Sequence, residues 1–187
     1  MSESETKRSA VSKRFLNTED PLLNEQETEQ LQAAVQLRRE GQGEEARLRM
    51  LELLEEFGES AKLLYELAST HDNLGLERQA VPYYVRSLEM GLGEPDRAEA
   101  LLGLGSTYRT LGKYEQAEQV LRAAVVEYPQ HRELHVFLAM ALHNLGKHAE
   151  AMALLLKEIA DHSSHIGVQS YQRAIAFYAD RLDEVWD

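Results

Sequence analysis

The chain has 187 residues, 43% of them apolar, a formal net charge of −12 and no cysteine. This length and apolar content allow one domain or one short repeat array with a buried core, while the negative charge disfavours nucleic acids and anionic lipids as partners. Without cysteine the chain can form neither disulfides nor cysteine-ligated metal sites, which suits a reducing compartment, so we predict a cytoplasmic protein.

The N-terminal residues lack the periodic apolar pattern of a helix or strand, so we predict a disordered tail over residues 1–20 and one folded domain over residues 21–187. The early basic residues precede no apolar core of a secretory signal, and no later run is long and apolar enough to span a bilayer. Asn24, followed three residues later by Glu27, indicates a capping box that starts the first helix.

A pattern of Gly after a helical run, with Ala five residues later, occurs four times along the chain. The pairs are Gly41/Ala46, Gly75/Ala80, Gly112/Ala117 and Gly146/Ala151, in steps of 34, 37 and 34 residues. Because Gly adopts the left-handed conformation that ends many helices, each pair predicts a turn between two helices. We therefore expect four helix hairpins, over residues 27–60, 61–96, 97–131 and 132–165.

Small residues also recur seven positions before each of these glycines. They are Ala34, Ala68, Gly105 and Ala139. Together with the four alanines of the Gly/Ala pairs, they let two helices cross closely.

The period of about 34 residues and these spaced positions resemble the tetratricopeptide repeat family over residues 27–165. The resemblance implies an all-α fold, a right-handed α-solenoid of about four antiparallel helix hairpins with a concave groove that binds peptides. The middle of the chain looks like a bacterial subgroup of the family. Where the family favours Trp early in the first helix of the fourth repeat, this chain has His135, which we expect in the hairpin interface.

Apolar residues at helical spacing follow the fourth hairpin and predict a capping helix over about residues 169–185. They are Tyr171, Ala174, Ile175, Tyr178, Leu182 and Val185. A solenoid needs such a lid over its last hairpin.

The resemblance further implies that the first helix of every hairpin lines the groove. The expected partner-binding residues are Tyr65, Ser69, Asn73, Leu102, Ser106, Arg109, Phe137, Met140, His143 and Asn144. Apolar anchors beside amide and hydroxyl groups suit an extended or helical peptide. The alternative is that Phe137 and Met140 only pack against a neighbouring helix.

Signatures of catalysis and of metal binding are weak or absent. The pairs His131/His135 and His162/His165 have the spacing of helix-borne metal ligands, but no acidic partner recurs at ligand spacing. Apart from His135, we interpret these histidines as solvated or loop residues. No nucleophile elbow and no phosphate-binding glycine loop occur. We therefore expect no catalytic residues, no metal and no cofactor.

These observations predict an adaptor, not an enzyme, that binds a protein or peptide ligand in its groove, with neither nucleic acid nor membrane as partner. Two alternatives stay open. One is a dedicated chaperone for a secreted or aggregation-prone partner. The other is a structural protein that forms a homo-oligomer through Trp186 and the last helix.

Overall fold

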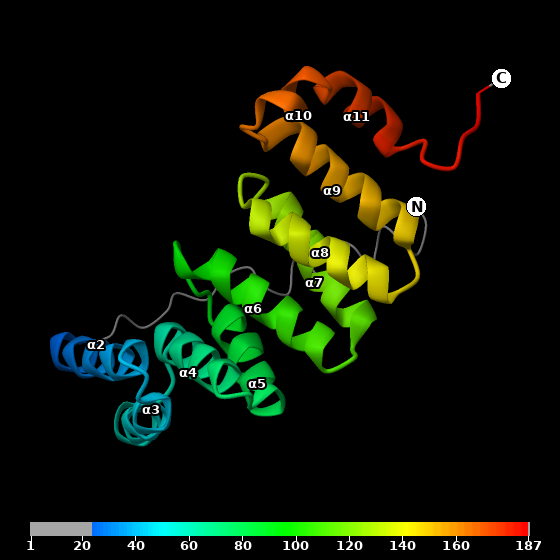
Figure 1. Ribbon diagram of the computed structural model, residues 1–187. Coiled ribbons are helices and arrows are strands. Elements are labelled where there is room, and N and C mark those ends of the chain that lie inside the picture. Colours follow the sequence, from blue (N-terminus) through cyan, green and yellow to red (C-terminus); the bar gives the residue numbers. More distant parts are fainter. Residues whose placement is uncertain (1–23, 187) are drawn as a thin grey trace. The chain divides into compact units, whose positions relative to one another are not determined.

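A computed structural model describes residues 24–186, which form ten α-helices and no strand (Figure 1). The predicted tail over residues 1–20 lies outside the described residues. Contacts divide the chain into two compact units, an N-terminal unit up to Leu111 and a C-terminal unit from Gly112. The single domain over residues 21–187 stays a prediction.

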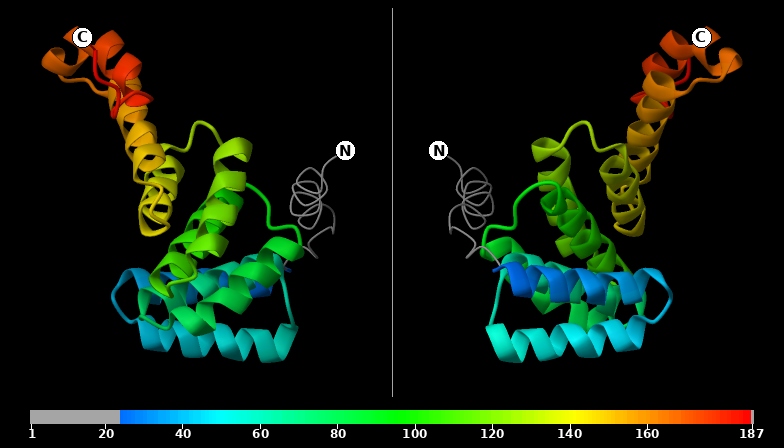
Figure 2. Two further views of the ribbon diagram at one scale, coloured as in Figure 1. Left: turned by 90° about the vertical axis from the view of Figure 1, so that its right-hand side faces the viewer. Right: turned by 90° about the vertical axis from the view of Figure 1, so that its left-hand side faces the viewer.

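The N-terminal unit consists of two helix hairpins and one further helix. These helices are α2 (Glu25–Arg39), α3 (Gly43–Phe57), α4 (Ala61–Asn73), α5 (Glu77–Glu89) and α6 (Asp96–Thr110). Helix α2 pairs with α3 and α4 pairs with α5, while α4 also contacts α2, α3 and α6 (Figure 2). The first helices α2, α4 and α6 are thereby brought together around α4.

The ends of these helices follow the predicted signals. The Asn24 side chain accepts a hydrogen bond from the Glu27 amide at 2.9 Å, and the Glu27 carboxylate accepts one from the Asn24 amide at 2.6 Å, which confirms the capping box. Gly41, Gly75, Gly112 and Gly146 have φ between 72° and 85°. Because this left-handed conformation costs an L-residue about 1–2 kcal/mol, the glycines set the hairpin turns as expected.

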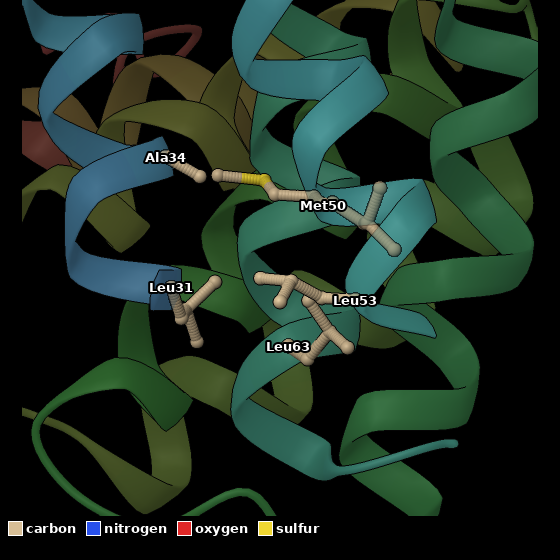
Figure 3. Close-up of a cluster of buried hydrophobic side chains, with 6 residues drawn as sticks. Leu31, Ala34, Met50, Leu53 and Leu63 are labelled. Carbon is tan, nitrogen blue, oxygen red and sulfur yellow. The ribbon is translucent and has the colours of Figure 1, made fainter. Parts of the chain in front are cut away.

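A buried cluster joins the first three helices (Figure 3). The cluster contains Leu31 and Ala34 of α2, Met50 and Leu53 of α3, and Leu63 of α4. The eight small residues that were expected at helix crossings are all buried. Removing a large side chain from such a core typically lowers the free energy of unfolding by about 2–5 kcal/mol.

The C-terminal unit consists of α7 (Tyr114–Glu127), α8 (Arg132–Asn144), α9 (His148–His162), α10 (Ile166–Ser170) and α11 (Gln172–Ala179). Helix α8 contacts both α7 and α9, and α10 and α11 both contact α9. Leu121 of α7 and Leu134 and Leu142 of α8 are fully buried in this unit. The N-terminal and C-terminal units therefore each have a core of their own.

The expected single capping helix over residues 169–185 is instead two short helices, so that prediction was wrong in extent. The chain turns at Tyr171, and helical structure ends at Ala179. The Arg181 side chain donates a hydrogen bond of 2.7 Å to the carbonyl of Phe177, while the Arg181 amide bonds Tyr178 instead. The carbonyl that would continue the helix is thus taken by a side chain.

Candidate protein-binding surface

Ion pairs and hydrogen bonds link the first helices of the N-terminal unit. Glu66 of α4 is buried and pairs with Arg38 of α2 at 2.7 Å and with Lys62 at 2.9 Å. Lys62 also binds Asp96 of α6 at 2.8 Å. This chain of alternating charges holds α2, α4 and α6 beside one another, so that one face carries residues from all three helices.

The ionisation of this network follows from its geometry. Burial alone would lower the pKa of Lys62, but hydrogen bonds to Asp96 and Glu66, and the charges of both, raise it above its usual range. Lys62 therefore stays charged at neutral pH. In a second contact, Asp72 of α4 accepts a hydrogen bond of 3.0 Å from Thr107 of α6, and burial raises the pKa of this carboxyl group.

Tyr65, an expected groove residue, serves the contact between α4 and α6. Its side chain is 7% exposed, and its hydroxyl donates a hydrogen bond of 2.9 Å to Glu99. Burial raises the pKa of the Tyr65 hydroxyl, and the hydrogen bond to Glu99 raises it further. The structure therefore gives Tyr65 a role in helix packing, with its polar group already satisfied.

The other expected residues of α4 and α6 are accessible. Asn73 is exposed, and Ser69, Leu102 and Ser106 are half-buried. Among the described residues, no side-chain hydrogen bond is seen for Asn73, Ser69 or Ser106. Their amide and hydroxyl groups are thus available to a ligand.

Arg109 is half-buried on α6, and its Nε is one of a few buried side-chain polar atoms of residues 24–186 that lack a hydrogen-bond partner. A buried N–H group without an acceptor costs about 1–3 kcal/mol. Its equivalents in the preceding repeats are satisfied, since Arg38 binds Thr70 at 3.1 Å and Asp72 binds Thr107. Within residues 24–186, Arg109 therefore differs from its equivalents in having a buried Nε without an acceptor.

In the C-terminal unit, the expected residues all lie on α8. Phe137 is half-buried, Met140 is 40% exposed, and His143 and Asn144 are exposed near the end of the helix. The Nδ1 atoms of His143 and of His148 on α9 lie 3.1 Å apart, so one ring nitrogen donates and the other accepts. This face offers one accessible thioether and polar groups beside it.

In the described part of the chain, no group of three or more His, Asp or Glu side chains lies where it could hold a metal ion. His135 lies at the interface of α8 and α9, as predicted. The sequence did not predict that its Nδ1 pairs with Glu158 there. His162 approaches the other oxygen of Glu158 at 3.7 Å.

Sequence analysis missed the network of Arg38, Lys62, Glu66 and Asp96. A signal was present, because Lys62 and Asp96 lie 34 positions apart, as do Tyr65 and Glu99. This spacing is three residues shorter than the 37-residue step between the second and third repeats, so each pair joins a residue of α4 to one that lies about one helical turn before its equivalent on α6, and the two meet when consecutive hairpins stack.

Helix hairpins that recur every 34 to 37 residues and stack through their first helices define a helical-repeat fold of the solenoid class. The chain belongs to the tetratricopeptide repeat family, because the family model described as Tetratrico peptide repeat matches residues 61–182.

Known proteins support the same fold. The solved structures titled "MamA RS-1 ArsTM double mutant" and "MamA 41-end from Desulfovibrio magneticus RS-1" both align with a TM-score of 0.62. The first is 19% identical and covers 87% of this chain and 99% of that one, and the second is 22% identical and covers 84% and 91%. At these identities the likeness shows the fold alone.

A curated relative is the human Protein O-mannosyl-transferase TMTC1, which is 33% identical over 88 residues. The match takes in 47% of this chain and 10% of that protein. The chain thus spans about a tenth of the length of this relative. None of the helices between residues 24 and 186 combines the length and the apolar character that a membrane crossing needs.

Proposed function

We propose that this protein is an adaptor that binds a segment of another protein on the first-helix faces of its repeats. The N-terminal unit contributes Ser69, Asn73, Leu102, Ser106 and Arg109, and the C-terminal unit contributes Phe137, Met140, His143 and Asn144. The mechanism consists of recognition and alignment, without a catalytic step.

The observation that carries this proposal is the unpartnered Nε of Arg109. This Nε is shielded from solvent, so a partner carboxylate or backbone carbonyl would become its acceptor once the half-buried side chain turns outward, and the guanidinium group could then hold a carboxylate through two parallel hydrogen bonds. The nearby hydroxyl and amide groups of Ser106 and Asn73 can bond the backbone of an extended segment. Met140, which is both exposed and adaptable in shape, suits an apolar anchor on the other unit.

Charge reversal at Arg109 tests the proposal. Cross-linked complexes of the full-length protein are captured from cells that express it, and partners are quantified for wild type, Arg109→Glu and the matched control Arg49→Glu on α3, whose side chain is 61% exposed. A captured partner is then purified and titrated against all three proteins. We expect Arg109→Glu to weaken its binding by about tenfold or more while circular dichroism stays unchanged.

Binding that Arg109→Glu leaves intact, or that Arg49→Glu weakens equally, would overturn the proposal. Met140→Ala provides a second test on the C-terminal unit, where we expect a loss of affinity without a change in helix content.

We also propose that the protein acts in the cytoplasm, because a chain of 187 residues without cysteine suits a reducing compartment. Fractionation of cells that express a tagged full-length protein tests this location. Recovery outside the cytoplasmic fraction would contradict it.

A further inference from the structure

An exposed aromatic cluster lies on the C-terminal unit and includes none of the residues assigned to partner binding. Phe177, Tyr178 and Trp186 are each about half exposed, at 49%, 47% and 53%. Their ring centroids lie 5.2 to 6.1 Å apart, within the range of favourable aromatic contacts. Clustered aromatic rings that stay exposed to water are typical of interaction sites.

A pocket of about 240 Å³ lies between α9 and residues 179–184, a segment that follows Tyr178 directly and ends two residues before Trp186. Its apolar lining includes Ala149, Ala153, Ala179 and Leu182. Ligand and cofactor sites typically have volumes of about 300–1,000 Å³, so this pocket better fits one side chain of a protein segment.

The charges around the pocket favour a cation. Among its lining carboxylates, Glu150 pairs with Arg122 at 2.8 Å and Asp180 pairs with Lys157 at 2.6 Å. Asp183 and Glu184 also line it, and neither has an ion-pair partner within residues 24–186.

The cation of the pocket lining is already engaged. The Arg181 guanidinium carbon lies 4.4 Å from the centroid of the Phe177 ring, and its Nη1 donates to the Phe177 carbonyl. Arg181 keeps its positive charge in these contacts, but the two carboxylates without an ion pair outnumber it. The apolar pocket therefore fits a lysine or arginine side chain, whose stem is apolar and whose head is charged.

The chain itself contains a segment with several basic residues next to apolar ones. Residues 7–16 read Lys-Arg-Ser-Ala-Val-Ser-Lys-Arg-Phe-Leu and include four of the chain's 20 basic residues and none of its 32 acidic residues. Phe15 and Leu16 follow Lys13 and Arg14 directly, so a cation can enter the pocket while an aromatic side chain lies next to the ring cluster. The basic side chains also suit cation–π contacts with Tyr178 and Trp186.

We propose that the basic segment at residues 7–16 of this chain docks on the surface formed by Phe177, Tyr178, Trp186, Asp183 and Glu184. A lysine or arginine of the segment occupies the pocket between α9 and residues 179–184, and Phe15 packs against the exposed rings. The docked segment neutralises the two free carboxylates and covers the aromatic cluster. This proposal is independent of the partner-binding function, because it uses a different surface.

The single tryptophan and the absence of cysteine make a direct test available in the full-length protein. A quencher attached at Ala10→Cys will reduce the fluorescence of Trp186 by about twofold or more if the segment is docked most of the time, because docking brings the quencher next to the ring cluster. Fluorescence should return at about 1 M salt, where the Debye length is about 3 Å.

Charge variants of the labelled protein separate docking at this surface from nonspecific attraction. Removing the two carboxylates with Asp183→Asn and Glu184→Gln should restore the fluorescence. The matched control, Glu55→Gln with Glu56→Gln, removes two exposed carboxylates from α3 and should leave the quenching unchanged. Absence of quenching, quenching that survives the first pair of substitutions, or equal recovery with the control pair would overturn the proposal.

A mixing experiment identifies the copy that supplies the segment. Labelled protein that also carries Trp186→Phe is added to unlabelled wild type. Quenching in the mixture supports docking between two copies, whereas quenching confined to the singly labelled protein supports docking within one copy.

Discussion

At Gly103 the backbone of α6 comes close to a side chain of α5. A methyl group there would lie 2.5 Å from the hydroxyl oxygen of Tyr84, which is buried. We expect Gly103→Ala to lower the free energy of unfolding by about 1–3 kcal/mol, although Ala favours helices, because the overpacked ring has little room to move. Urea denaturation measures the effect, with Gly93→Ala as a control in open space. Equal stability of the Gly103→Ala variant and the wild type would contradict this packing.

His71 makes the stability of the N-terminal unit depend on pH. Its Nδ1 lies 2.8 Å from the Leu67 carbonyl, its ring packs on Tyr83 at 5.1 Å, and burial lowers its pKa below the usual 6.5. The unfolded chain then binds the proton more readily than the folded one, so the contribution of neutral His71 is complete above pH 6.5 and is lost as the pH falls below it.

The pH dependence can be isolated with His71→Gln. As the pH falls from above 6.5, the stability advantage of wild type over this variant should shrink, as followed by denaturation at a series of pH values. Substitution of the exposed His165 by Gln serves as the control. Parallel pH profiles for wild type and His71→Gln would show that His71 does not titrate in this way.

At the scale of elements, Glu118 fastens α7 to the start of α9. Its carboxylate accepts hydrogen bonds of 2.7 and 2.8 Å from Lys147, which precedes α9, and one of 2.6 Å from Arg122. Burial would raise the pKa of Glu118, but these hydrogen bonds and charges lower it below 4.5. The stabilisation is therefore present above pH 4.5 and is lost as the pH falls below it.

Glu118→Gln should lower the free energy of unfolding by about 1 kcal/mol at neutral pH, because both cations stay partly exposed and solvent screens them. The difference from wild type should fade on acidification below pH 4.5. Thermal unfolding measures it, and Glu115→Gln, on an exposed position of the same helix, is the comparison. A Glu118→Gln protein as stable as the comparison would show that this contact contributes nothing.

Particular helices and turns show which features of the fold the sequence predicts. Gly75 and Ala80 have equivalents in the other repeats. The left-handed conformation that glycine favours predicted the hairpin turns, and the small size of alanine predicted the helix crossings. The break after Ala179 depends on the Arg181 side chain reaching a carbonyl, which helical periodicity does not encode. The candidate surface itself stays a prediction, which the sequence places on the first helices of the hairpins. Only coordinates showed that Tyr65 is buried in a contact and that Arg109 lacks an acceptor.

For the whole molecule, the two units have separate cores, so we expect a destabilising substitution to affect mainly the unit that carries it. Leu67→Ala in the N-terminal unit and Leu142→Ala in the C-terminal unit should each cost about 2–5 kcal/mol, since both side chains are fully buried. Helical repeats interact mainly with their neighbours, so hydrogen exchange should quicken most in the unit that carries the substitution. Uniform loss of protection along the chain after either substitution would contradict this expectation.

The most direct measurement for the central claim is photo-cross-linking from single positions of the full-length protein. A photoreactive residue replaces Ser106 on α6, Met140 on α8 or, as the control, the exposed Gln79 on the second helix α5, and labelled partner peptides are identified by mass spectrometry. Binding on the first-helix faces predicts partner cross-links from Ser106 and from Met140 and none from Gln79. Cross-links from Gln79 alone would contradict the claim.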